Sequence, residues 1–369
     1  MEHISKLPGC NDVSIYLGNA CNFNCTYCDR DFIKNDIGNQ QLEETDIPHI
    51  IYFLKQMSTD GQFPVPMLSF HGGEPLIWIK LIDKIMDAIT LEFPGQTFPI
   101  FIQTNGSRIA KNEWFFEKWN SRLNISISYD FIFQPINRTD FNIHDALAVL
   151  TKHKTSNTQL QYVLPVQHKE AFSLRNLKAI TDICNKHNVR KVDLIPLRHL
   201  RGKTKFKSMI DEIPDLKQFF HAFLKFIQML YIQGIDVNVD GHGDGIDKHY
   251  YDNHKQLVLS PDGFIYPEYD FLEYQQHETV IGEWRREFDE GGAPVIKVYR
   301  DEAAREEQLI HDKCKICPSR NSCGIKFLYH MWDQVPGDSC VEFYKMVDIL
   351  ILHAQKLKEK PTLLHWIGI

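Results

Sequence analysis

Short apolar runs of four to seven residues alternate along the chain with longer stretches in which apolar residues recur every three or four positions. The short runs predict buried β-strands and the longer stretches predict amphipathic helices, which together indicate repeated βα units. The predicted strands cover residues 13–17, 67–70, 98–103, 124–128, 160–165 and 192–196. The predicted helices cover residues 45–57, 78–93, 114–119, 144–153 and 174–187. The predicted fold is therefore α/β, a partial (β/α)6 TIM barrel, in which the working residues lie at the C-terminal ends of the strands.

The length of the chain indicates more than one domain. At 369 residues it exceeds what a single hydrophobic core usually supports. We expect the barrel to occupy residues 1–236 and a smaller domain to occupy residues 237–369.

Charge and composition exclude some classes of protein. The formal net charge of −7 argues against a generic nucleic-acid binder. Residues 1–10 contain no apolar signal-peptide core, and no run approaches the ~18 apolar residues of a membrane span. Nine cysteines in such a chain favour thiolate ligands over disulfides. We therefore expect a cytoplasmic protein that does not bind membranes.

Three closely spaced cysteines follow the first predicted strand: Cys21, Cys25 and Cys28. A 4Fe–4S cluster usually takes four thiolates from the protein, so a set of three leaves one iron open for a small molecule. The alternative is a zinc knuckle, but zinc sites usually pair a C-x2-C with a second pair of ligands nearby. No His or Cys follows Cys28 before His49, which favours the iron–sulfur interpretation.

The CxxxCxxC spacing, with Tyr27 just before the third cysteine, resembles the signature loop of radical S-adenosylmethionine (SAM) enzymes. The resemblance implies that the three cysteines are catalytic: their reduced cluster passes one electron to SAM and releases a 5'-deoxyadenosyl radical, which takes a hydrogen atom from the substrate. It also implies an electron donor such as flavodoxin or ferredoxin. In such chemistry the protein holds, orients and shields the cofactor.

A second motif, Gly72-Gly73-Glu74-Pro75, follows the second predicted strand. Two glycines let the backbone approach a ligand closely, and Glu74 adds an acceptor. Alone, the segment would be a plausible tight turn. One βα unit after the cysteine loop, it resembles the segment with which radical SAM enzymes hold the methionine amino group of the cofactor.

Two further residues lie at the ends of the next strands. Asn105 follows the third strand and Ser128 ends the fourth. The resemblance implies that both contact the ribose or the carboxylate of SAM. The alternative is an ordinary Asn-Gly turn and an ordinary strand end.

A second cysteine group lies near the C-terminus, and its members are Cys314, Cys317, Cys323 and Cys340. Four thiols form a closed site that suits a 4Fe–4S cluster or zinc. The spacing resembles the auxiliary-cluster site of SPASM-type radical SAM enzymes, and residues 260–267 resemble the hairpin that opens that domain. A complete SPASM domain holds two auxiliary clusters, but Glu268 and Phe327 stand here where further cysteine ligands would be. We therefore predict a reduced domain with one auxiliary 4Fe–4S cluster.

The SPASM resemblance implies a peptide or protein substrate, often a ribosomally made precursor, which is oxidised or cross-linked. The first predicted strand begins near residue 13, so we expect a separate protein to deliver the peptide. Glu268 and Asp270 are candidate substrate-facing bases, or plain hairpin carboxylates. Cys184, on the apolar face of a predicted helix, is expected to be a buried structural thiol.

A basic segment after the sixth strand leaves another substrate open. Its cations are Arg198, Arg201, Lys203, Lys205 and Lys207. They could bind phosphates or an acidic peptide, or form a solvated loop. A radical SAM enzyme that modifies a nucleic acid or nucleotide is therefore the alternative function, and a non-catalytic iron–sulfur binding protein is a more distant one.

Overall fold

The computed structural model describes residues 10–28, 40–58, 67–155, 157–165, 168–196, 199–200, 207–208, 216–239, 255–266, 280, 282–284, 287–292, 294 and 296–298. Within these residues the dominant element is one 11-stranded sheet. Its parallel strands, in spatial order, are β10 (Lys255–Leu259), β1 (Cys10–Tyr16), β2 (Met67–His71), β3 (Ile100–Thr104), β4 (Leu123–Ser128), β5 (Asn157–Leu164), β6 (Lys191–Pro196) and β9 (Asp236–Val239). Beyond β10 the sheet continues antiparallel through β11 (Phe264–Tyr266), β12 (Gly282–Glu283) and β13 (Lys297–Val298). Two short strands, β7 (His199–Leu200) and β8 (Lys207–Ser208), pair separately.

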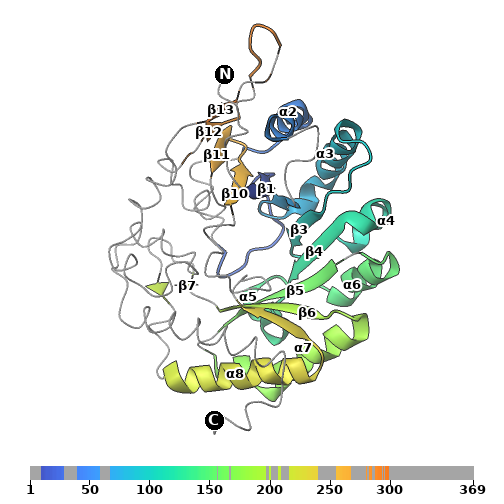
Figure 1. Ribbon diagram of the computed structural model, residues 1–369. Coiled ribbons are helices and arrows are strands. Elements are labelled where there is room, and N and C mark those ends of the chain that lie inside the picture. The colour runs from blue at the N-terminus through green and yellow to red at the C-terminus, as the bar shows by residue number, and fades with distance from the viewer. Residues whose placement is uncertain are drawn as a thin grey trace.

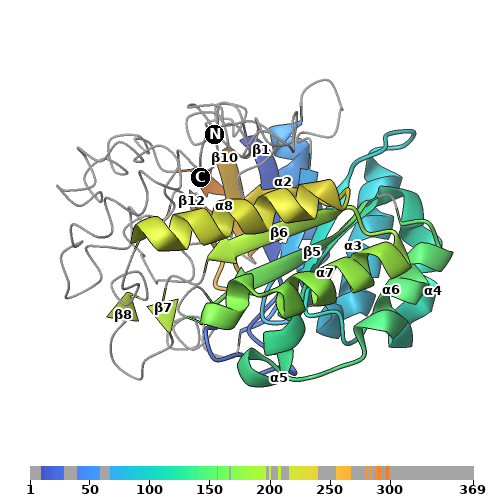
Figure 2. The same ribbon diagram turned by 90° about the horizontal axis from the view of Figure 1, so that it is seen from below.

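Helices cover the outer face of the curved sheet (Figure 1). They are α2 (Ile47–Met57), α3 (Ile79–Glu92), α4 (Glu113–Trp119), α6 (Ile143–Lys152), α7 (Leu174–His187) and α8 (Leu216–Ile232). The short helix α5 (Gln134–Asn137) lies in the loop after β4. Figure 2 shows α7 and α8 crossing the sheet near β5 and β6. None of the helices in the described part of the chain is long and apolar enough to cross a membrane.

The predicted α/β fold is confirmed. All six predicted strands and all five predicted helices are present, with ends that differ by a few residues. The structure adds α8 and places two more parallel strands, β9 and β10, at the two sides of the predicted set. β10 is the first strand of a hairpin whose turn is closed by Gly263 N–H donating to the Ser260 carbonyl at 3.0 Å. The predicted domain boundary, between residues 236 and 237, falls inside β9 and stays a prediction.

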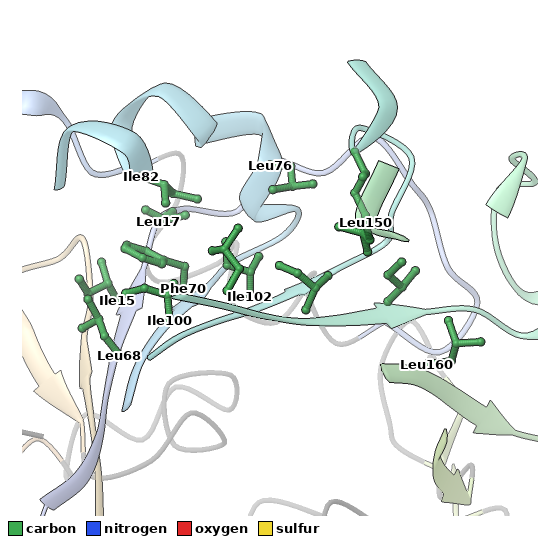
Figure 3. Packing of buried hydrophobic residues seen from close by; sticks show 14 of the residues in the cluster. Ile15, Leu17, Leu68, Phe70, Leu76, Ile82, Ile100, Ile102, Leu150 and Leu160 are labelled. Atoms are coloured by element: carbon green, nitrogen blue, oxygen red, sulfur yellow. The ribbon is translucent and has the colours of Figure 1, made fainter. Parts of the chain in front are cut away.

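The two faces of the sheet differ in chemistry because side chains alternate along each strand. On the helix-covered face, Leu68, Phe70 and Ile102 are fully buried and pack with residues of α3 such as Ile82 (Figure 3). The opposite face carries polar residues: the Ser69 hydroxyl donates to the Asp12 carboxylate at 2.8 Å. The barrel interior is therefore polar where the exterior is apolar.

Cys184 lies on α7 and is fully buried within the hydrophobic core. Burial raises the pKa of its thiol to about 12, so the reactive thiolate is scarce at neutral pH. The prediction of a buried structural thiol is confirmed.

Candidate active site

The loops that follow the first four parallel strands meet at one end of the sheet. Residues 18–28, here called the cysteine loop, follow β1, and residues 72–75 follow β2. Asn105 follows β3, and Asp130 lies just after β4. Because neighbouring parallel strands end at the same edge, their loops are brought together there. The two sequence motifs and the two softer candidates thus share this end of the barrel.

Two backbone hydrogen bonds join the cysteine loop to the glycine segment. Gly73 N–H donates to the Gly18 carbonyl and Glu74 N–H donates to the Ala20 carbonyl, both at 2.9 Å. A Cβ atom on Gly72 would lie 2.7 Å from the Gly18 oxygen, and one on Gly73 would lie 2.5 Å from the Ala20 oxygen. Only glycine allows the two main chains to come this close. The glycines therefore hold the cysteine loop against β2, whatever else they bind.

The Glu74 carboxylate is fully buried and is used inside the protein. It accepts hydrogen bonds from Leu76 N–H at 3.0 Å, from the Thr104 hydroxyl at 2.6 Å and from Asn105 N–H at 2.7 Å. Burial raises the pKa of Glu74, while these three donors act in the opposite direction. The carboxylate thus connects the loop after β2 to the loop after β3, and the adjoining Pro75 is buried as well.

The three cysteines of the loop are free thiols. Cys25 is buried, Cys21 and Cys28 are half-buried, and Cys28 N–H donates to the Cys25 carbonyl at 3.3 Å. In the described part of the chain no three His, Cys, Asp or Glu side chains converge as ligands of a single metal ion would. A cubane cluster is larger than one ion and separates its thiolate ligands more widely. The donor set, three thiols on one short loop, fits a 4Fe–4S cluster with one iron left without a protein ligand.

Tyr27 lies in a charged network at the end of β4. Its hydroxyl donates to the Asp130 carboxylate at 2.7 Å and accepts from Arg138 Nη1 at 2.9 Å. Burial raises the pKa of Asp130, and the neighbouring Arg138 guanidinium opposes that change. Thr26 N–H also donates to the Asn137 carbonyl at 2.9 Å. The two residues that precede Cys28 are therefore hydrogen-bonded to α5 and to the segment just after β4.

Ser128 and Asn105, the two softer candidates, make different contacts. The Ser128 hydroxyl donates to Gln161 Oε1 at 3.0 Å, and the same oxygen accepts from Gln103 Nε2 at 2.5 Å. This group of uncharged polar side chains lines the inner face of the sheet. Asn105 lies instead beside Cys21, with its amide nitrogen 3.9 Å from the Cys21 sulfur. The predicted contact of both residues with SAM stays a prediction.

Several predicted site residues lie outside the described residues. They are Cys314, Cys317, Cys323, Cys340, Glu268, Asp270, Arg198, Arg201, Lys203 and Lys205.

Two residues that the structure brings to the site have no sequence signal. Arg138 lies 111 residues from Tyr27 in the chain, and Gln161 lies 33 residues from Ser128. Neither belongs to a motif. For Asn22 the sequence contains a signal, because two asparagines lie between Cys21 and Cys25. In the structure, Asn22 accepts a hydrogen bond from the Asn105 amide.

Replacing Gly73 tests the close approach of the two loops. Gly73 has no left-handed backbone strain, so Gly73→Ala adds only a methyl group against the Ala20 carbonyl. We expect it to lower the free energy of unfolding by about 1–3 kcal/mol, as overpacking of a close contact does. Urea denaturation of the metal-free protein measures this change.

Gly291→Ala is the matched control, because its added Cβ would meet only the flexible Asp289 side chain, at 3.3 Å. It should change the stability by less than about 0.5 kcal/mol. Equal stability of the two variants would contradict the assigned role of the glycine segment.

Comparison with known families gives a match over the part of the chain that contains these loops. Residues 15–128 match the profile of the Radical SAM superfamily. An uncharacterised protein of Methanocaldococcus jannaschii is 30% identical over 112 residues, which cover 30% of this chain and 35% of the relative. The match thus spans about a third of the length of that relative. The 7-carboxy-7-deazaguanine synthase of Clostridium acetobutylicum is 25% identical over 199 residues, which cover 54% of this chain and 77% of the relative.

Two solved structures share the fold over most of the chain. The structure of anSMEcpe with bound AdoMet and Kp18Cys peptide has a TM-score of 0.64 and 16% identity, and the match covers 94% of this chain and 99% of that one. SuiB of Streptococcus suis, bound to the precursor peptide SuiA, has a TM-score of 0.60 and 15% identity, over 90% of this chain and 76% of that one. At these identities the likeness concerns the fold.

The family match and the site agree. The matched residues begin within β1 and end with β4, so they contain the cysteine loop, the glycine segment and Asn105. A 4Fe–4S cluster and SAM are the cofactors of this family, and the donor set of the loop fits them. Residues 15–128 therefore match the Radical SAM superfamily, and this part of the chain contains all three thiols of the cysteine loop.

Proposed function

We propose that this chain is a radical SAM enzyme that modifies a peptide or protein, by oxidation or cross-linking. The observation that carries the proposal is the meeting of the cysteine loop and the glycine segment at the C-terminal ends of β1 and β2. The loop carries three thiols, and no fourth cysteine lies close to them in the sequence. One iron of a 4Fe–4S cluster would therefore have an open coordination position for a small molecule.

The residues of the chain divide the work at this site. Cys21, Cys25 and Cys28 hold the cluster through their thiolates. When bound, the cluster and SAM supply a one-electron cleavage that yields a 5'-deoxyadenosyl radical. The carboxylate of Glu74 is occupied by three internal donors, so the glycine segment meets the cofactor through its main-chain groups. Tyr27 and Ser128 would contact other parts of SAM.

Two observations support a peptide or protein as the substrate class. The fold likeness extends over 94% of the chain to a structure that holds the Kp18Cys peptide, and over 90% to one that holds the precursor peptide SuiA. The inner face of the barrel carries the uncharged amides of Gln103 and Gln161 beside the Ser128 hydroxyl. Amide and hydroxyl groups pair well with the N–H and C=O groups of a peptide backbone. A separate recognition protein would deliver the peptide.

One auxiliary 4Fe–4S cluster forms part of the proposal. Its ligands would be Cys314, Cys317, Cys323 and Cys340, which follow the hairpin formed by β10 and β11. This hairpin extends the barrel sheet, because β10 pairs with β1. An auxiliary cluster would accept the electron left on an oxidised substrate, or would only join the C-terminal region to the barrel.

A second candidate function has a specific observation in its favour. The synthase of Clostridium acetobutylicum named above makes a deazaguanine, a base-like product, and its match covers 54% of this chain. Modification of a nucleotide or nucleic acid is therefore the rival. The basic segment after β6 would then bind phosphates.

Formation of 5'-deoxyadenosine tests the catalytic assignment. The anaerobically reconstituted and reduced protein should form this product from SAM. Cys25→Ala should lower the rate at least about 100-fold, since loss of an outer partner of a metal ligand alone costs about 10–100-fold. Cys184→Ala, the matched control, removes a buried thiol that lies on α7 and should leave most of the activity. Activity that survives Cys25→Ala would refute the catalytic role of the loop.

Iron and sulfide analysis tests the auxiliary cluster. Two 4Fe–4S clusters require about eight irons per chain. Replacing Cys314 and Cys317 together with alanine should bring the content to about four, since only the cluster of the cysteine loop remains. A wild-type content near four that this double variant does not change would show that the auxiliary cluster does not exist.

Mass spectrometry of candidate substrates separates the two functions. We expect the reconstituted enzyme to change the mass of a peptide or protein. Its binding to oligonucleotides should be weak and should fall little with added salt. A mass change confined to nucleotides or oligonucleotides, lost when Arg201, Lys203 and Lys205 are neutralised, would favour the rival function.

A further inference from the structure

The side chain of Asn105 belongs to a hydrogen-bond network around Cys21. Its amide nitrogen lies 3.9 Å from Cys21 Sγ and donates to Asn22 Oδ1 at 3.0 Å. Its oxygen accepts from Ser107 N–H at 3.0 Å and from the Ser107 hydroxyl at 2.7 Å. Asn22 closes the network by donating to the Ser107 hydroxyl oxygen at 2.9 Å. We call Asn22, Asn105 and Ser107 the Cys21 amide network.

The network fixes which end of the Asn105 amide faces the sulfur. A main-chain N–H can only donate, so the amide atom that meets Ser107 N–H must be the oxygen. The NH2 group is thereby turned toward Asn22 and Cys21. One of its hydrogens serves the Asn22 oxygen, and the other is directed to the thiol of Cys21.

The hydrogen-bonding capacity of this amide is fully used. Both hydrogens of the NH2 group and both lone pairs of the oxygen have protein partners. Asn105 is also only 4% exposed. This assignment differs from the contact with SAM that the family resemblance implies, which stays a prediction.

The backbone of Asn105 is held by the glycine segment. Its N–H donates to Glu74 Oε2 at 2.7 Å, and the preceding Thr104 hydroxyl donates to the other carboxylate oxygen at 2.6 Å. Glu74 is fully buried, so these bonds are not exchanged with water. A continuous path of short contacts therefore runs from Glu74 through Asn105 to the sulfur of Cys21.

Building on the proposed function, we propose that Asn105 is a positioning residue that donates a hydrogen bond to the Cys21 thiolate and raises the reduction potential of the cluster. Hydrogen bonds to ligand sulfurs and the surrounding partners of ligands are established means of tuning such clusters. A donor stabilises the more negative, reduced cluster more than the oxidised one. The Phe23 N–H, 3.4 Å from the same sulfur, supplies a second donor, which the Asn105 variants leave in place.

A redox titration of the reconstituted protein, followed by electron paramagnetic resonance, tests the proposal. Asn105→Ala removes the donor, and Asn105→Asp keeps the shape but replaces the donor with an acceptor. Both should make reduction about tenfold less favourable, which lowers the midpoint potential by about 59 mV for a one-electron couple. Asn112→Ala is the matched control, because it also removes an amide donor, but one that donates to the Arg108 carbonyl at 2.8 Å. The midpoint potential of this variant should equal that of the wild type.

Ser107→Ala gives a milder test. It removes the hydroxyl that orients the Asn105 oxygen and keeps the Ser107 N–H, so the potential should fall in the same direction by a smaller amount. If the Asn105 variants do not retain iron, the midpoint potential of Ser107→Ala tests the proposal instead. Wild-type potentials in the variants that retain iron would overturn the role of Asn105 alone. A wild-type protein with no 4Fe–4S signal would overturn the proposed function together with this inference.

Discussion

The site depends on the close approach of two loops. The cysteine loop lies against the glycine segment so tightly that a single added methyl group would stand 2.5 Å from a carbonyl oxygen. Two main-chain hydrogen bonds hold this arrangement, and the buried Glu74 carboxylate connects the glycine segment to the loop after β3. A buried carboxylate is costly unless several donors surround it, and here three do. The position of the cysteine loop is thus set by contacts that the protein itself makes.

Much of the fold could be predicted because the strands of the barrel are short apolar runs between helices. β1 to β6 are buried on both faces or packed under helices, so their sequences differ sharply from the loops. β9 was missed because it has only four residues, and only two of them are apolar. The pairing of β10 with β1 joins residues more than 200 positions apart, and no local pattern encodes such a contact. The apolar pattern of α8 was present in the sequence but was not assigned.

The site was predictable where chemistry requires a spacing, as in the three cysteines and the glycine pair. The parts of the site that depend on contacts between loops distant in the sequence could not be predicted. Asn105 shows the difference: the sequence places it at the end of a strand, but only the structure brings its amide to the Cys21 sulfur, 84 residues away in the chain. Arg138 reaches Tyr27 across a similar distance and has no sequence signal. Partners of ligands arise from tertiary packing, which spacing alone does not reveal.

We propose that Cys21, Cys25 and Cys28 hold a cluster with one iron open to SAM. Electron paramagnetic resonance of the reduced cluster, recorded with and without added SAM, is the decisive measurement. We expect SAM to change the spectrum, because the sulfonium compound binds the open iron, and we expect no such change in Cys25→Ala. A reduced cluster whose spectrum is the same with and without SAM, or a centre that contains zinc, would refute the open iron site.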